Sequence, residues 1–227
     1  MSKLLVVVDM QWDFVYGSLG TKEAQAIVPF VIEKIKNTNA DCVVYTLDLH
    51  NDNYMETKEG RYLPVPHCFA GTGGSQVIPE IQELWGDRKV NTVHKSTFGF
   101  YDWDSWLGED DFDEIEFIGV CTDICVVSNA LILKSLCPES TFIVDATCCA
   151  GSTPDAHIAA LKVMRSCHME IQNWEEERKP VEPFVRDTYV GYWMTCPTCG
   201  YENNLAEAKF CANCSQKFDR SELDDDM

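Results

Sequence analysis

The chain has 227 residues, enough to bury a full hydrophobic core, and 45% of them are hydrophobic, as in an ordinary globular protein. Its formal net charge of −19 argues against binding to nucleic acid or to an anionic membrane, because phosphate contacts need clustered Lys and Arg. The first apolar run is too short for a signal peptide and no run is long enough to span a bilayer, so we expect a cytoplasmic protein whose 12 cysteines are reduced, metal-bound or catalytic.

Short apolar runs predict the strands of one sheet, and amphipathic segments between them predict helices. The predicted strands are, in chain order, 3–8, 42–47, 90–94, 115–120, 141–144 and 169–172. The predicted helices cover 23–36, 77–84, 126–136 and 155–166. Strands that alternate with helices imply right-handed crossovers, so we expect a three-layer, doubly wound α/β fold around a mostly parallel six-stranded sheet.

Shifts in composition predict four parts of the chain. We expect the α/β domain over 1–174, a charged, proline-containing linker over 175–191, a small cysteine-rich unit over 192–218 and an acidic disordered tail over 219–227. Within the first part, 51–74 is rich in Gly, Pro and polar residues. A loop of that length in a compact domain usually carries function.

Chemically versatile side chains lie where the first four predicted strands end. Asp9, Asp48 and Lys95 end or follow the first three strands, and Cys125 comes shortly after the fourth. Ligands bind off the carboxyl ends of parallel strands, so we expect these four residues to converge. A cysteine in the first turn of a helix feels the positive end of the helix dipole, which lowers the thiol pKa and favours the thiolate.

This arrangement suggests acyl transfer with Cys125 as nucleophile, Asp9 as proton acceptor and Lys95 as charge partner. His94 alternates with Lys95 along the strand and should face the other side of the sheet. The backbone N–H groups of Cys121 and Cys125 could stabilise an oxyanion. Each residue also has a plainer interpretation, as a turn cap, a solvated cation or an inert core thiol, and the spacing alone leaves both interpretations open.

Three segments together resemble the signature segments of the isochorismatase-like cysteine hydrolases. They are 6–14, 94–100 and 119–126, and the stretch from 144 to 164 resembles the segment located after the nucleophile in that family. The resemblance implies Asp9 as base, Lys95 as stabiliser of the transition state and Cys125 as nucleophile. It also implies a cis peptide bond between Val120 and Cys121.

A metal site is indicated by Asp48 and His50, which share one face of an extended segment, and by His67, which returns at the end of the long loop. Such ligands suit Zn²⁺, Fe²⁺ or Mn²⁺, and the alternative is a turn-capping pair. These residues resemble the metal loop of the nicotinamidase/pyrazinamidase branch of the family. That resemblance implies a fourth ligand, for which we prefer Glu59 to Glu56.

The same resemblance implies an amidohydrolase that converts nicotinamide to nicotinate and ammonia through a cysteine thioester, in NAD salvage. One alternative is a related cysteine hydrolase of another small amide or carbamoyl compound, and another is a non-catalytic scaffold that recruits partners through the C-terminal unit. Phe14, Phe98 and Tyr101 are candidates for the wall of an aromatic slot, although aromatic stripes more often belong to the core.

The cysteine-rich unit contains a CxxC…CxxC pair that resembles a zinc ribbon. Its cysteines are Cys196, Cys199, Cys211 and Cys214. Four thiolates close a tetrahedral shell, so we expect a structural Zn²⁺ without which this short unit would not fold. The alternative is four free thiols in an unstructured tail. Nearby acids balance the basic residues, so we expect a protein partner or a homo-oligomer here rather than nucleic acid.

Overall fold

The computed structural model describes residues 2–85, 90–174, 184–188, 191–195 and 202–204. The chain divides into two compact units, Met1–Trp174 and Glu175–Met227. The first unit contains six parallel strands in the order β3-β2-β1-β4-β5-β6. Their bounds are β1 Lys3–Val8, β2 Cys42–Asp48, β3 Asn91–Lys95, β4 Glu114–Val120, β5 Thr141–Ala150 and β6 Glu170–Gln172. The six-stranded sheet is confirmed, and it is parallel throughout.

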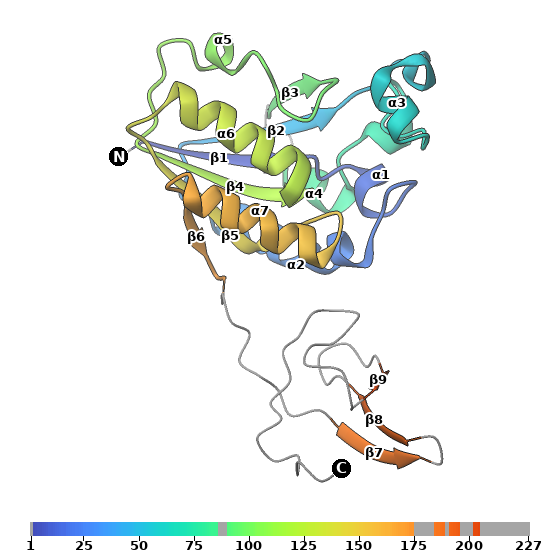
Figure 1. Cartoon of the computed structure of the whole chain (residues 1–227). Coiled ribbons are helices and arrows are strands. Elements are labelled where there is room, and N and C mark those ends of the chain that lie inside the picture. The colour runs from blue at the N-terminus through green and yellow to red at the C-terminus, as the bar shows by residue number, and fades with distance from the viewer. Residues whose placement is uncertain (1, 86–89, 175–183, 189–190, 196–201, 205–227) are drawn as a thin grey trace. The chain divides into compact units, whose positions relative to one another are not determined.

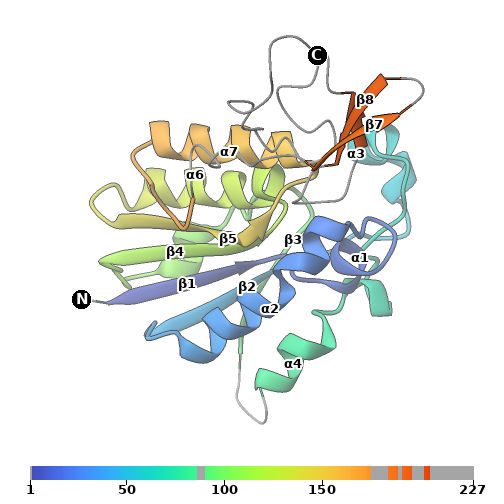
Figure 2. The ribbon, with the colours of Figure 1, turned by 90° about the horizontal axis from the view of Figure 1, so that it is seen from below.

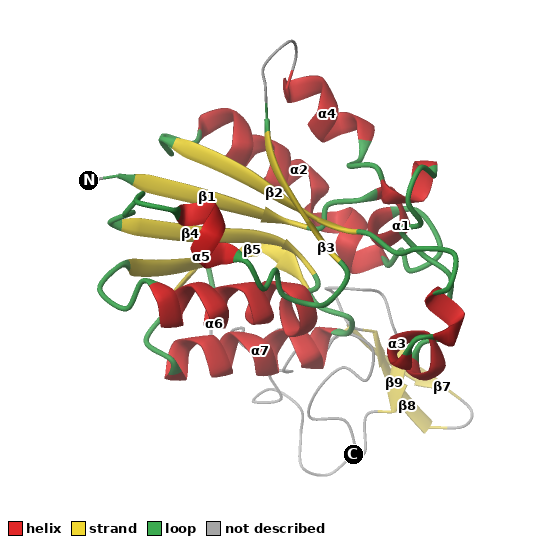
Figure 3. Ribbon diagram, turned by 90° about the horizontal axis from the view of Figure 1, so that it is seen from above, coloured by secondary structure: helices red, strands yellow, loops and turns green. Residues whose placement is uncertain are grey.

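Helices cover both faces of this sheet and give the expected three layers (Figures 1, 2 and 3). One face carries α2 and α4, and the other carries α6 and α7. The helices are α1 Trp12–Val15, α2 Lys22–Asn37, α3 Lys58–Tyr62, α4 Pro79–Trp85, α5 Trp103–Leu107, α6 Val127–Leu136 and α7 Pro154–Ser166. Shorter turns are η1 Tyr54–Glu56, η2 Gly73–Ser75 and the π-helical η3 Thr122–Val126. No helix in the described part of the chain has both the length and the apolar character needed to cross a membrane.

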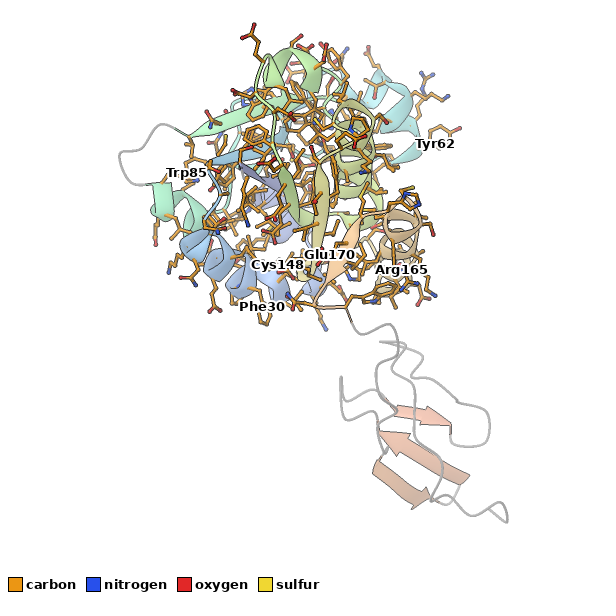
Figure 4. All side chains as sticks on the ribbon, turned by 90° about the vertical axis from the view of Figure 1, so that its left-hand side faces the viewer. Phe30, Tyr62, Trp85, Cys148, Arg165 and Glu170 are labelled. Carbon is orange, nitrogen blue, oxygen red and sulfur yellow. The ribbon has the colours of Figure 1, made fainter. Side chains whose placement is uncertain are left out.

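Strand β1 forms the centre of the core, which explains its unbroken apolar sequence. Leu4 and Val6 pack into the cluster under α6 and α7, while Leu5 and Val7 pack into the cluster under α2 and α4. Large apolar side chains that point away from the sheet, such as Phe30 of α2 and Tyr62 of α3, are exposed (Figure 4). The order of the strands reverses between β1 and β4, the point at which open parallel sheets bind ligands.

Two predicted boundaries differ from the structure by more than two residues. Strand β5 continues beyond 144 to Ala150, and its extension is buried on both faces of the sheet, with Cys148 in one core cluster and Cys149 in the other. In the second unit, β7 Phe184–Thr188, β8 Gly191–Thr195 and β9 Glu202–Asn204 form an antiparallel sheet.

The linker predicted over 175–191 therefore contains a strand at 184–188, which the neighbouring run of charges obscured in the sequence. The four predicted zinc ligands, Cys196, Cys199, Cys211 and Cys214, lie outside the described residues, as does the predicted tail over 219–227.

Candidate active site

Asp9, Lys95 and Cys125 meet at the carboxyl edge of the sheet. Asp9 follows β1 directly, Lys95 is the last residue of β3, and Cys125 lies in η3 after β4. The ammonium Nζ of Lys95 lies 2.6 Å from Asp9 Oδ2 and 3.5 Å from Cys125 Sγ. All three side chains are buried, whereas His94 is exposed on the other face of β3. The convergence expected from the strand ends is therefore present.

The charge balance around Asp9 favours proton uptake. Burial raises the pKa of the Asp9 carboxyl above its ordinary value, and the Lys95 ammonium opposes this only in part, while the nearby Asp48 carboxylate adds to the rise. Thr46 Oγ1 donates a hydrogen bond to Asp9 Oδ1 over 2.6 Å, which orients the carboxyl group. A carboxylate with a raised pKa is a stronger base, so Asp9 is suited to accept a proton.

The expectation that Cys125 is a thiolate in the resting protein is wrong. Burial raises the pKa of the Cys125 thiol well above its ordinary value, and the Asp9 charge raises it further, against a smaller opposing effect of Lys95. Dehydration of a buried thiolate costs more free energy than the helix dipole returns. Cys125 is thus a neutral thiol placed beside a base.

The backbone between β4 and α6 carries Cys125 into place. Gly119 has φ 116°, and a Cβ atom there would collide with the carbonyl oxygen of Val8 on the neighbouring strand, so only glycine fits. The peptide bond between Val120 and Cys121 is cis, at the position that the family resemblance implies. The π-helical turn comes next, and the predicted helix start at 126 shifts to Val127.

A second cluster, formed by Asp48, His50 and His67, lies beside these residues. Asp48 Oδ2 is 3.0 Å from His50 Nε2 and 3.3 Å from His67 Nε2, and the candidate ligand atoms of the three lie within 4.8 Å of one another. Lys95 Nζ lies 3.7 Å from Asp48 Oδ1, so the two clusters are adjacent. This is a candidate site for one divalent metal ion.

The imidazole Nε2 atoms of His50 and His67 are available as metal ligands. His50 Nε2 is buried and makes no hydrogen bond with any described residue. His67 Nδ1 lies 2.8 Å from the carbonyl oxygen of Val65, which can only accept, so in the neutral ring Nδ1 holds the proton and Nε2 offers its lone pair to a metal. Two imidazole lone pairs and a carboxylate, with positions left open, match the ligand set of a catalytic metal. Glu59 Oε1 lies 3.8 Å from His50 Nε2, whereas Glu56 is exposed, which favours Glu59 as a fourth ligand.

Some residues that hold these clusters were missed in the sequence. The Gln11 side-chain amide accepts from the backbone N–H of Asp48 and donates to its carbonyl oxygen. The Tyr54 ring packs on both imidazoles, with centroids 4.5 Å from His50 and 5.0 Å from His67. Of these residues, only Thr46 could have been found from the sequence. It lies two residues before Asp48, so the alternation of side chains along β2 places both on the same face.

The predicted aromatic slot is only partly matched. Phe14 is buried and packs edge-on against the His67 ring with centroids 5.5 Å apart, next to the metal cluster. Phe98 is 50% exposed, and Tyr101 is 82% exposed and contacts Phe100. Phe14 is therefore the aromatic residue that the structure brings to the site most closely among the three candidates.

Comparisons with known proteins show the family to which this chain belongs. The family model described as the isochorismatase domain matches residues 3–176, so the chain belongs to the isochorismatase family. An uncharacterised isochorismatase family protein, PncA of Bacillus subtilis, is 33% identical over 145 residues, covering 58% of this chain and 78% of that protein. The nicotinamidase/pyrazinamidase of Mycobacterium tuberculosis is 28% identical over 186 residues, covering 74% and 97%.

A crystal structure of the pyrazinamidase of Pyrococcus horikoshii in complex with zinc superposes with a TM-score of 0.60 at 25% identity, covering 77% of this chain and all of that chain. Family membership and these nicotinamidase-like relatives identify the chain as a hydrolase of amide bonds.

Proposed function

We propose that this protein hydrolyses nicotinamide, or a closely similar heteroaromatic amide, to the carboxylic acid and ammonia, as a step in NAD salvage. The observation that carries the proposal is the buried contact of base, cation and thiol, in which Lys95 Nζ lies 2.6 Å from Asp9 Oδ2 and 3.5 Å from Cys125 Sγ. The adjoining candidate metal cluster and the nicotinamidase-like relatives support the choice of substrate.

In the first half of the reaction, the Cys125 thiol gives its proton to Asp9 as Sγ bonds to the amide carbon. The backbone N–H groups of Cys121 and Cys125 stabilise the oxyanion, and the Lys95 ammonium balances the negative charge. The C–N bond then breaks, and the leaving nitrogen takes the proton from Asp9 and departs as ammonia. A thioester between Cys125 and the acyl group remains.

In the second half, water adds to the thioester carbon and gives a proton to Asp9. The C–S bond breaks, the acid leaves, and Cys125 recovers its proton from Asp9. Asp48, His50 and His67, with Glu59 nearby, would hold a divalent ion, which would supply a Lewis acid for orienting the substrate. Phe14 would wall the aromatic ring on the side of His67.

Ammonia release from nicotinamide and pyrazinamide by the metal-loaded full-length protein tests the proposal. Cys125→Ala should lower kcat by about 10⁴-fold or more, because no other group can form the acyl-enzyme. Cys149→Ala, which removes a thiol from the same core cluster, should keep wild-type activity. A wild type without activity on any small amide would refute the proposal, and activity that survives Cys125→Ala would refute the mechanism.

The structural Zn²⁺ predicted in the second unit stays a prediction, since its cysteines lie outside the described residues. If both metal sites exist, elemental analysis should find two ions per chain. The variant Cys196→Ser should lose one of them while it retains amidase activity, because the four thiolates are proposed to serve structure alone.

A further inference from the structure

One buried amide, that of Asn129, uses all four of its hydrogen-bonding positions around the nucleophile. Asn129 lies one helical turn after Cys125, and its Nδ2 donates to the carbonyl oxygens of Cys125 over 2.8 Å and of Phe98 over 3.3 Å. Its Oδ1 accepts from the Phe100 N–H over 2.9 Å and from the Trp103 indole N–H over 3.0 Å. The side chain is wholly buried, so every bond it forms is within the protein.

Three of the four partners of Asn129 lie in the segment that follows Lys95: Phe98 and Phe100 in a loop and Trp103 at the start of α5. The loop over 96–102 joins β3, which ends with Lys95, to α5. The loop packs closely against α6. At Gly99 the approach is so close that a Cβ atom would collide with the Ile132 side chain. Thr97 Oγ1 donates to the Gly99 carbonyl oxygen over 2.8 Å and braces the loop from inside. The loop is therefore held in one conformation against the helix that comes after the nucleophile.

We infer that Asn129 is a positioning residue that fixes the 96–102 loop, and with it Lys95, relative to the Cys125 sulfur. The inference rests on the proposed function for its catalytic meaning. A smaller side chain at position 129 would leave buried N–H groups of Phe100 and Trp103 without an acceptor, and such groups pull the loop away to find one. A displacement near 1 Å between reacting groups can cost about 100-fold in rate.

The test uses the full-length protein with Asn129→Ser, and with Trp103→Phe as a milder change that removes one donor to Oδ1. Trp106→Phe is the control, because it makes the same substitution at a neighbouring position. The Trp106 ring packs on Trp103 with centroids 5.3 Å apart. Three quantities are measured: kcat and KM for nicotinamide, the alkylation rate of Cys125 by iodoacetamide, located by peptide mass spectrometry, and the melting temperature.

For Asn129→Ser we expect kcat to fall by about 100-fold, with a smaller rise in KM and slower alkylation of Cys125. Trp103→Phe should change the same quantities in the same direction by about tenfold or less. Trp106→Phe should keep wild-type values. A purely structural role predicts a lower melting temperature with unchanged kcat, KM and alkylation rate, and that result would overturn the inference.

If Asn129→Ser fails to fold, the two tryptophan variants decide, and equal behaviour of Trp103→Phe and Trp106→Phe overturns the inference. The alkylation measurement needs no substrate. Slower alkylation in Asn129→Ser, together with a wild type that hydrolyses no amide, would refute the proposed function and still support the positioning role.

Discussion

The first unit contains two lysine–aspartate pairs of nearly equal length that belong to different kinds of site. Lys95 Nζ lies 2.6 Å from Asp9 Oδ2, and Lys34 Nζ lies 2.7 Å from Asp145 Oδ2. Both aspartates are buried. The difference between the pairs lies in what else each carboxylate touches, and it distinguishes the pair that we propose to be catalytic from the other.

Asp145 has a surplus of donors. Its Oδ1 accepts from the Thr147 N–H, from the Thr147 hydroxyl and from the Asn173 amide, at 3.1, 2.8 and 3.0 Å. Burial acts to raise the pKa of Asp145, but these hydrogen bonds and Lys34 outweigh it and the pKa is lowered. Asp9 accepts a hydrogen bond from Thr46 and forms an ion pair with Lys95, but it also lies near the Asp48 carboxylate, and its pKa is raised. A buried carboxylate that accepts several hydrogen bonds stays ionised. A buried carboxylate with few donors takes up a proton more readily, which is the property that a general base needs.

The comparison is tested most strongly by removing each carboxylate. Asp9→Asn should lower kcat by about 10³-fold, because an amide cannot take the thiol proton. Asp145→Asn should keep kcat within about threefold, because Asp145 is engaged with structural donors alone. Steady-state ammonia release measures both. Equal losses in the two variants would show that the pairs do not differ in function.

Removing each lysine gives the next largest difference. Lys95→Met leaves Asp9 and Asp48 without their buried cation and should cost about 3–5 kcal/mol in metal-depleted protein. Lys34→Met should cost about 1 kcal/mol, because Lys34 is partly exposed and water can replace it, while Thr147 and Asn173 still satisfy Asp145. Urea denaturation monitored by circular dichroism compares the variants. A larger loss in Lys34→Met would contradict this account.

The metal cluster extends the comparison, since Lys95 also lies near Asp48. His50→Ala should weaken divalent binding by more than about 100-fold, because it removes a direct ligand. His94→Ala, on the exposed face of β3, should leave binding unchanged. Calorimetric titration with zinc gives the affinity, and elemental analysis gives one ion fewer in His50→Ala than in His94→Ala. Retention of that ion by His50→Ala would remove His50 from the site.

The sequence could predict residues whose position depends on a strand end, such as Asp9, Asp48 and Lys95, because strand direction and period are local properties. The position of Cys125 could be predicted, but the protonation state of its thiol could not, because desolvation depends on packing that only the fold creates. Asn129 and Tyr54 were not predictable. Their partners come from loops, and loop conformation is decided by contacts distant in sequence.

The smallest expected effect is the pH dependence of the structural pair, and its sign comes from the lowered pKa of Asp145. A carboxyl whose pKa is lower in the folded than in the unfolded chain stabilises the fold fully above its unfolded value, about 3.9, and loses that contribution as the pH falls through the folded value. The stability difference between wild type and Asp145→Asn should therefore be constant from about pH 7 to pH 5 and shrink below about pH 4. The variant Asp104→Asn, at an exposed position, serves as the control for the removal of one carboxylate at each of these pH values. If the stability difference between wild type and Asp145→Asn instead grew on acidification, Asp145 would be protonated in the folded protein. Both aspartates would then have raised pKa values, and the two pairs would not differ in this property.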